Sequence, residues 1–303
     1  MGKIAFVFAG QGAQAPGMGK GFFEMSEAAR EVFAAADKIR PGTSVQCFEG
    51  TEEELQETKN TQPCLYTVEM AAAQAVKEAG IDCDVCAGFS LGELSALTYA
   101  GAMSLEDGLR IVNRRAALMQ ECAEQSDTSM AAVIKLTNEQ VEQVCGRFDK
   151  IYPVNFNCPG QVTVSGDANE MIAFADAVKE AGGRAKVLKV NGAFHSPYMT
   201  PAAEGFSEEL DKYEFSAPVK TVYSNFTGAQ YHDNIKEYLV SQINNPVRWE
   251  TIVRDMIENG VDTFIELGPG KTLTGLIKRI SSDVKLFNVS VPEDITKIKE
   301  ELS

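Results

Sequence analysis

The sequence predicts an α/β protein in which a mainly parallel sheet is flanked by helices and a small α+β subdomain is inserted in the middle of the chain. Short apolar, β-rich segments alternate with amphipathic helical patterns in both halves of the sequence. Between residues 127 and 193 the pattern changes to a strand-rich order. The 303 residues, of which 44% are apolar, can bury a sizeable core as one large domain or two unequal ones.

The first half begins with a strand. Residues 4–8 (Ile-Ala-Phe-Val-Phe) form a continuous apolar run that ends in glycines, as in a buried parallel strand that enters a turn. An amphipathic helix is expected over residues 21–38, and Thr51 to Glu54 form a capping box. Thr61 is expected to cap a further helix with Pro63 in its first turn. The remaining elements expected here are a strand at 84–89 and helices at 91–99 and 104–123.

The inserted segment, residues 127–193, has the order β-α-β-β-α-β of ferredoxin-like domains. Its elements are expected at residues 130–136, 138–148, 151–156, 161–165, 169–182 and 185–190. Residues 1–126 and 194–303 are therefore expected to form the large α/β domain. Its second half should contain a helix at 199–212, a strand at 220–224, helices at 234–243 and 248–259, a strand at 263–267 and a helix after Gly270.

Charge and composition exclude several classes of protein. Lys and Arg number 28 against 43 Asp and Glu, and the net charge of −15 is the wrong sign for binding nucleic acid or an anionic membrane. No apolar run approaches the ~20 residues that span a bilayer. The seven scattered cysteines favour reduced thiols and a cytoplasmic protein. Cys83-x-x-Cys86 could be a redox pair or half a zinc site, but there is no second CxxC and only two histidines, so free thiols and no metal are predicted.

The most informative motif is Gly88-Phe89-Ser90-Leu91-Gly92, a GxSxG that lies between a predicted strand and a predicted helix. Glycines relieve the backbone crowding of such a sharp turn, while the serine hydroxyl is held clear of the sheet. Backbone amides at the start of the helix can stabilise a negative oxygen. Ser90 is therefore a candidate nucleophile, the alternative being a helix-capping serine at an ordinary turn.

A serine nucleophile needs a base within hydrogen-bond reach. His232 lies in a polar stretch and is expected to face solvent. His195 lies in Gly-Ala-Phe-His-Ser-Pro, where the chain leaves the small domain and re-enters the large one. Because domain junctions often form clefts, His195 is the favoured base, the alternative being a structural histidine.

Two glycine-containing segments resemble nucleotide-binding motifs. Residues 10–15 fit GxGxxG/A, but no helix follows at once and no acidic residue ends a second strand, so dinucleotide binding is disfavoured. A loop at the carboxyl edge of the sheet that offers a backbone N–H to an oxyanion fits better. Gly270-Lys271-Thr272 resembles a P-loop but lacks its first glycine.

Arginines on the long helix before the inserted segment fall on two faces. Asp107, Arg110 and Arg114 share one face, where they can pair or be solvated. Arg115 instead falls in an apolar row with Met119. An arginine there needs an anion, which is either a carboxylate of the protein or a substrate carboxylate held by the guanidinium fork.

Together these motifs resemble the malonyl-coenzyme A:acyl carrier protein transacylase family of type II fatty-acid synthesis, over essentially the whole chain. Departures are Phe89, where many members have histidine, and Ala9 in place of a common proline. The motifs that carry the resemblance are Phe8–Gln14, Asn60–Pro63, Gly88–Glu93, Arg115–Gln120, Asn155–Gln161, Gly192–Pro197, Asn245–Trp249 and Glu266–Gly270.

The resemblance implies a hydrolase-like α/β core with a ferredoxin-like insertion, and malonyl transfer from malonyl-coenzyme A to acyl carrier protein through a malonyl-serine. Ser90 would be the nucleophile and His195 the base. The family pattern further implies oxyanion-hole amides from Gln11 and Leu91, malonyl binding by Arg115 and Gln62, a methyl-excluding Phe194, and a main-chain carbonyl at Arg248 that orients His195. No cofactor is implied, coenzyme A entering only as a thioester substrate.

Two other classes remain open from the sequence. A serine hydrolase, such as a thioesterase, would need an acidic third member, and several acids lie between Ser90 and His195. A non-catalytic protein could have kept the fold. Because acyl carrier proteins are acidic, a docking surface should be locally basic. Two segments qualify, one with Lys179, Arg184, Lys186 and Lys189, the other with Lys271, Lys278, Arg279 and Lys285.

Overall fold

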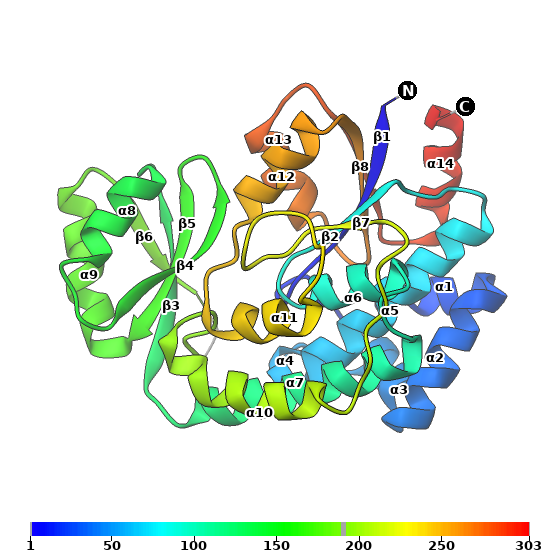
Figure 1. The fold of residues 1–303 in the computed structure, drawn as a ribbon, viewed down its shortest axis with the longest axis horizontal. Coiled ribbons are helices and arrows are strands. Elements are labelled where there is room, and N and C mark those ends of the chain that lie inside the picture. The colour runs from blue at the N-terminus through cyan, green and yellow to red at the C-terminus, as the bar shows by residue number, and fades with distance from the viewer. Residues whose placement is uncertain (1, 189–191, 303) are drawn as a thin grey trace.

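The computed structural model describes residues 2–188 and 192–302, and it contains two separate sheets (Figure 1). The larger sheet has five strands in the order β7-β2-β1-β8-β9, all paired in parallel. The α/β class with a mainly parallel sheet is thus confirmed. The strands are β1 (Lys3–Phe8), β2 (Val85–Gly88), β7 (Thr221–Val222), β8 (Val261–Leu267) and β9 (Lys285–Val289).

Both faces of this sheet are covered, which is why β1 is apolar at every position from Ala5 to Phe8. Phe6 and Phe8 face a core that includes residues of α2, α5, α6 and α7, whereas Ala5 and Val7 face one formed with α12 and α13. The helices before the insertion are α1 (Lys20–Met25), α2 (Glu27–Ile39), α3 (Thr43–Glu49), α4 (Glu52–Gln56), α5 (Thr58–Glu78), α6 (Gly92–Tyr99) and α7 (Leu105–Glu124). Those after it are the 3₁₀ turn η1 (Pro197–Met199), α10 (Thr200–Leu210), α11 (Ile235–Asn244), α12 (Trp249–Glu258), α13 (Thr272–Ile280) and α14 (Pro292–Leu302).

The second sheet is antiparallel, with the strand order β4-β5-β3-β6, and lies to one side of the parallel sheet in Figure 1. Numbered within the insertion this order is 2-3-1-4, and the predicted β-α-β-β-α-β sequence of elements is confirmed. The domain boundaries at 126/127 and 193/194 stay a prediction. The elements are β3 (Thr128–Ile134), α8 (Asn138–Cys145), β4 (Ile151–Cys158), β5 (Gln161–Asp167), α9 (Ala168–Glu180) and β6 (Arg184–Val187). Of the strand predicted at 185–190, Lys189 and Val190 lie outside the described residues.

Two helix predictions were wrong in detail. The helix expected over 21–38 is two helices, because the Ser26 hydroxyl accepts a hydrogen bond from the Ala29 N–H at 3.0 Å and starts α2 anew. Helix α5 begins before Thr61, whose hydroxyl donates to the carbonyls of Leu55 and Glu57, and Pro63 lies inside it. The capping box at Thr51 and Glu54 is confirmed. Helices α3 and α14 and strand β9 were not predicted.

Candidate active site

Ser90 occupies a strained turn between β2 and α6. Its φ is 53°, in the left-handed region that side chains rarely adopt. Glycine is required on either side, because a Cβ on Gly88 would lie 1.8 Å from the carbonyl carbon of Gly92, and one on Gly92 would lie 2.1 Å from the Phe8 oxygen. The GxSxG motif therefore brings α6 against the carboxyl end of β1 and holds the Ser90 hydroxyl at the edge of the sheet.

The Ser90 Oγ lies 2.8 Å from Nε2 of His195, although 105 positions separate them. His195 is buried and also has a positive φ, of 60°. Its Nδ1 lies 2.7 Å from the main-chain oxygen of Gln242. Because a carbonyl can only accept, Nδ1 carries the proton and Nε2 is free to accept the serine proton. The other histidine, His232, is exposed, as expected.

The carbonyl that orients His195 was expected at Arg248, and that prediction was wrong. The Arg248 oxygen accepts the N–H of Ile252 at 3.1 Å, because Arg248 is the N-cap residue directly before α12. The last turn of α11 leaves carbonyls without helical donors, and Gln242 lies in that turn. A helix C-terminus therefore supplies the acceptor that an acidic side chain supplies in a Ser-His-Asp triad.

Burial controls the protonation of this pair. Desolvation, followed by the positive charge of Arg115, lowers the pKa of His195 to about 4, while hydrogen bonds to the main chain at Gln242 and Asn245 oppose the shift. The ring is therefore neutral at pH 7, which is the state a general base needs.

Arg115 points inward from α7 and is only 1% exposed. Its Nη1 donates to the Gln62 amide oxygen at 2.7 Å, and its Nη2 donates to the Gln242 amide oxygen at 2.7 Å and to Ser90 Oγ at 3.2 Å. Its Nε is buried without a partner, and no carboxylate of the described chain forms an ion pair with it. Burial lowers the pKa of Arg115 to about 10, so the guanidinium stays charged at pH 7.

Sequence reasoning missed Gln242, which hydrogen-bonds to Ser90, Glu93, Arg115 and His195. Its Nε2 donates to the Ser90 carbonyl and to Glu93 Oε2, both at 2.7 Å, while its two oxygens serve Arg115 and His195. No sequence motif marks it. Glu93, directly after GxSxG, is the nearest signal, since a buried carboxylate needs donors around it.

Glu93 is fully buried and is held by three donors, the Tyr231 hydroxyl, the Gln242 amide and the Asn225 N–H. Burial raises its pKa to about 7 against the opposing effect of these hydrogen bonds and of Arg115. Glu93 and Arg115 form no direct ion pair among the described residues, and the Gln242 side chain hydrogen-bonds to both of them.

The two amides expected to form the oxyanion hole have no hydrogen-bond acceptor among the described residues. Asn225 Oδ1 takes the N–H of Ser90 at 2.6 Å, whereas the N–H groups of Leu91 and Gln11 donate to no group in the described ranges. The loops that carry them are in close contact, since a Cβ on Gly10 would lie 2.7 Å from the Phe89 oxygen. Both amides are therefore available to an incoming oxygen.

A cavity of about 270 Å³ opens beside this turn. Gln11 and Phe89 line it from the parallel-sheet side, Asn155 and Met130 from the antiparallel sheet, and Leu273 from α13. The Phe89 ring packs against Trp249 with centroids 5.8 Å apart, so an apolar contact stands where a polar histidine is common in the family. Asn155 Oδ1 is buried and has no hydrogen-bond partner in the part of the chain that the structure describes. Phe194 is buried in the same apolar cluster as Met130.

Other candidate sites from the sequence have no such geometry. Cys83 Sγ and Cys86 Sγ are 3.5 Å apart, and both cysteines are free. Within residues 2–188 and 192–302, no group of three or more His, Cys, Asp or Glu side chains could hold a metal ion. In the same ranges, none of the helices has the length and apolar character needed to cross a bilayer.

Comparisons with known proteins agree with this geometry. A family model described as an acyl transferase domain matches residues 5–293. The chain is 41% identical over 303 residues to the malonyl CoA-acyl carrier protein transacylase of Bacillus subtilis (strain 168), which covers 97% of this chain and 96% of that protein. The crystal structure of malonyl CoA-acyl carrier protein transacylase from Clostridium perfringens matches with a TM-score of 0.96 and 38% identity over 99% of this chain and 97% of that one. A malonyl-transacylase in complex with its type II PKS acyl-carrier protein matches with a TM-score of 0.95 and 34% identity over 99% of both chains.

A serine at a strand-to-helix turn with a buried histidine in hydrogen-bond reach, on an α/β fold, is the arrangement that acyl transfer through a serine requires. With the family match over residues 5–293, the chain belongs to the acyl transferase domain family. Within that family, its full-length relatives place it among the malonyl-CoA:acyl carrier protein transacylases, as the sequence motifs predicted.

Proposed function

We propose that this protein transfers a malonyl group from malonyl-coenzyme A to the phosphopantetheine thiol of acyl carrier protein by a ping-pong mechanism. The observation that carries the proposal is the buried Arg115 guanidinium, which hydrogen-bonds the nucleophile and two amides but no described carboxylate. Its Nη2 lies 3.2 Å from Ser90 Oγ and its Nε has no partner among the described residues, so this guanidinium fits an acyl group that ends in a carboxylate.

In the first half-reaction, His195 Nε2 takes the Ser90 proton as Oγ attacks the malonyl thioester carbon. The carbonyl oxygen becomes an oxyanion, which the N–H groups of Gln11 and Leu91 stabilise. The tetrahedral intermediate then collapses, the C–S bond breaks, and the proton on His195 passes to the departing coenzyme A thiolate. The products are malonyl-Ser90 and free coenzyme A.

The second half-reaction reverses these steps with a different thiol. His195 takes the proton of the phosphopantetheine thiol, whose sulfur attacks malonyl-Ser90, and the proton returns to Ser90 Oγ as the ester breaks. The 270 Å³ cavity, bounded by Gln11, Phe89 and Asn155, is the proposed path of the phosphopantetheine arm in both half-reactions. No cofactor is needed, because both transfers exchange an ester with a thioester.

A hydrolase is the less suitable alternative. His195 is held by a main-chain carbonyl instead of the acidic third member that α/β-hydrolases use. A buried guanidinium also suits a dicarboxylic half-thioester better than a neutral lipid acyl chain. The seven free cysteines are typical of a protein in a reducing compartment, and the proposed location is the cytoplasm.

Intact-protein mass spectrometry tests the proposal. After mixing with malonyl-coenzyme A the protein should gain one malonyl group, and adding acyl carrier protein should remove it. The Ser90→Ala variant is the control and should gain nothing. Release of free malonate in place of transfer to the carrier would identify a hydrolase, and no mass gain at all would identify a binding protein.

Docking of the acidic carrier protein on the inserted subdomain stays a prediction. Arg184 and Lys186 are exposed on β6, while Lys189 lies outside the described residues. Charge reversal at Lys186 should raise the KM for carrier protein and leave the KM for malonyl-coenzyme A unchanged. Equal changes in both constants would count against docking there.

A further inference from the structure

Glu69 is a fully buried acidic residue that the proposed mechanism does not use. It lies on α5, the helix that also carries Gln62. Its Oε2 accepts a hydrogen bond from the Ser95 hydroxyl at 2.6 Å, whereas its Oε1 has no hydrogen-bond partner in the described ranges. None of the ion pairs of the described chain includes it. Burying such a group is costly, and a role at a site is one reason for a protein to keep it.

The segments around Glu69 are those that carry the proposed oxyanion hole. Ser95 lies on α6, one helical turn after Leu91, whose N–H is one of the two amides. Ala9 continues β1 into the loop of Gln11, and its N–H is close enough to the Glu69 carboxyl group to favour the charged form. Glu69 therefore lies behind the nucleophile turn, between α6 and the end of β1.

The backbone packs closely around this side chain. Gly268, in the loop after β8, has a φ of 108°, and a Cβ there would lie 2.9 Å from Cγ of Glu69. At the start of α6, a Cβ on Gly92 would lie 2.8 Å from the Ala9 oxygen. Tightly packed interiors transmit a displacement instead of absorbing it. A change at the contact of Glu69 with Ser95 should therefore shift α6 relative to β1.

The surroundings of Glu69 favour its neutral, protonated form. Burial raises the pKa of Glu69 well above its ordinary value, and the charge of Glu266 on β8 adds to the shift, while the hydrogen bonds to Glu69 oppose it. Glu266 holds a negative charge more readily, because it accepts the N–H of Leu273 at 2.9 Å and that of Thr274 at 2.8 Å. Glu69→Gln would thus preserve both the shape and the neutrality of the native group.

We propose that Glu69 is a positioning residue for acyl transfer, which holds α6 against the end of β1 and thereby sets the spacing of the Leu91 and Gln11 amides. The inference rests on the proposed function, in which these amides stabilise the oxyanion. Because Ser95 lies one turn from Leu91, a displacement of α6 at Ser95 moves the Leu91 N–H as well. Oxyanion-hole donors act at about 3 Å, so such a displacement slows the chemical step more than it weakens thioester binding.

Steady-state kinetics of full-length variants tests this role. Glu69→Leu keeps most of the side-chain volume and removes the hydrogen bond with Ser95, so it should lower kcat about tenfold or more and leave the KM for malonyl-coenzyme A within twofold of native. Ser95→Ala is a smaller change that removes the same hydrogen bond from the other side, and it should lower kcat in the same way. Glu69→Gln should stay within about threefold of native, because a neutral amide replaces a neutral acid.

Tyr66→Phe is the matched control. The Tyr66 hydroxyl and Thr98 Oγ1 form a buried hydrogen bond of 2.8 Å that also joins α5 to α6, but farther along α6 from Ser90. This variant should keep kcat within twofold of native. Equal losses of kcat in Tyr66→Phe and Ser95→Ala would show that the packing of α5 on α6 is required in general, and would overturn the proposal.

A second readout does not depend on malonyl transfer. An alkyl fluorophosphonate attaches to an activated serine as a P–O bond replaces its P–F bond, and its phosphoryl oxygen needs the same oxyanion donors. Intact-protein mass spectrometry gives the rate at which Ser90 is modified. The rate should be close to native in Glu69→Gln and Tyr66→Phe, and about tenfold or more below native in Glu69→Leu and Ser95→Ala.

The two proposals can fail separately. If the native protein reacts with the fluorophosphonate but gains no malonyl group, the proposed function fails, and the slow modification of Ser95→Ala still supports the role of Glu69. Native rates of modification in Glu69→Leu and Ser95→Ala would overturn that role. A rate in Glu69→Gln as low as that in Glu69→Leu would overturn it too, because the neutral amide would then fail to replace the acid.

Discussion

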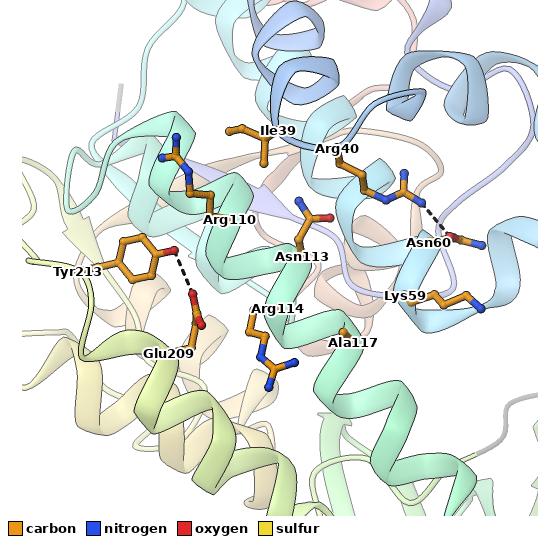
Figure 2. Close-up of a pocket in the computed structure, with 10 residues that line it drawn as sticks. All are labelled: Ile39, Arg40, Lys59, Asn60, Arg110, Asn113, Arg114, Ala117, Glu209 and Tyr213. Atoms are coloured by element: carbon orange, nitrogen blue, oxygen red, sulfur yellow. Dashed lines mark hydrogen bonds between the residues drawn. The ribbon is translucent and has the colours of Figure 1, made fainter.

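Arg114 and Arg115 are neighbours on α7 with the same side chain, and the fold places them in opposite surroundings. Arg115 is buried, donates to Gln62, Gln242 and Ser90, and has its pKa lowered by desolvation. Arg114 is exposed at the edge of a wide cavity (Figure 2) and has no hydrogen-bond partner among the described residues. Burying the Arg115 guanidinium removes its hydration shell at a large cost in free energy, and neutral side chains hold it in place. The Arg114 guanidinium stays hydrated. The inward arginine should therefore respond far more strongly to substitution.

The largest expected effect is that of Arg115→Ala on malonyl selectivity. The kcat/KM for malonyl-coenzyme A should fall about 10²- to 10³-fold, since losing one partner of a buried charge contact costs about 2–5 kcal/mol. Acetyl transfer should be retained or improved, because an acetyl group has no carboxylate. Steady-state kinetics with both thioesters, after circular dichroism to check the fold, measures this. An unchanged preference for malonyl over acetyl would remove Arg115 from the site.

Gln242→Ala should have the next largest effect, and on both substrates. Its main-chain carbonyl remains for His195, but Arg115, Glu93 and the Ser90 carbonyl each lose a partner. Unsatisfied buried groups cost about 1–3 kcal/mol, so kcat/KM should fall about 10- to 100-fold. Ser241→Ala, on the same helix, is the control and should stay within twofold of native. A loss confined to malonyl-coenzyme A would mean that Gln242 acts only through Arg115.

The pH dependence of kcat/KM should also distinguish Arg115 from Arg114. His195 must be neutral to act as a base, and its pKa of about 4 predicts that kcat/KM stays level from pH 7 down to about 5 and falls below that. Arg115 is one cause of the low value, so Arg115→Ala should move the fall to higher pH in the acetyl reaction. Arg114→Ala should not move it. A fall centred near pH 6.5 in the native enzyme would show that His195 is not desolvated.

The lowered pKa of His195 also makes the free energy of unfolding depend on pH. The folded pKa of His195 lies below its unfolded value, so its contribution is present above about pH 6.5 and is lost as pH falls toward 4. Glu93 acts oppositely, because its folded pKa of about 7 lies above its unfolded value, and stability is lost as pH rises through 7. Urea unfolding of Glu93→Gln and the native protein at pH 6 and pH 8 should show a smaller pH dependence in the variant.

The smallest effect is expected for Arg114→Ala. An exposed side chain without partners changes the free energy of unfolding by no more than about 0.5 kcal/mol. Malonyl transfer should stay within twofold of native. Urea unfolding and steady-state kinetics measure both quantities. A loss as large as that of Arg115→Ala would mean that the two faces of α7 are not independent.

Much of the fold could be predicted because its signals are local. The apolar run at β1, the capping box at Thr51 and the strand–serine–helix order around Ser90 depend on residues close in sequence. Two errors had different causes. Ser26 divides the first predicted helix through a local hydrogen bond from the Ala29 N–H, which the continuous apolar pattern concealed, whereas the short strand β9 forms because β8 lies beside it.

Within the site the sequence pointed to Ser90, His195, Arg115 and Gln62, and the fold brings their side chains together. It did not point to Gln242, because a glutamine in an ordinary amphipathic helix carries no sequence signature. Its role is visible only in the fold, where its side-chain amide lies between three groups from other elements. Arg248 was named from the resemblance to the family, whereas the carbonyl that contacts His195 belongs to Gln242. Which carbonyl faces the imidazole depends on where α11 ends and α12 begins, and the end residues of helices are poorly fixed by sequence.

The sequence alone determined the order of elements and the residue types for chemistry, since periodicity, glycines at tight turns and a serine in GxSxG act over a few positions. Only the tertiary structure decided which groups meet, how deeply they are buried and therefore which charges they hold. Arg114 and Arg115 differ by a single position, and the 100° that separates successive residues on a helix places one guanidinium in water and the other beside the nucleophile.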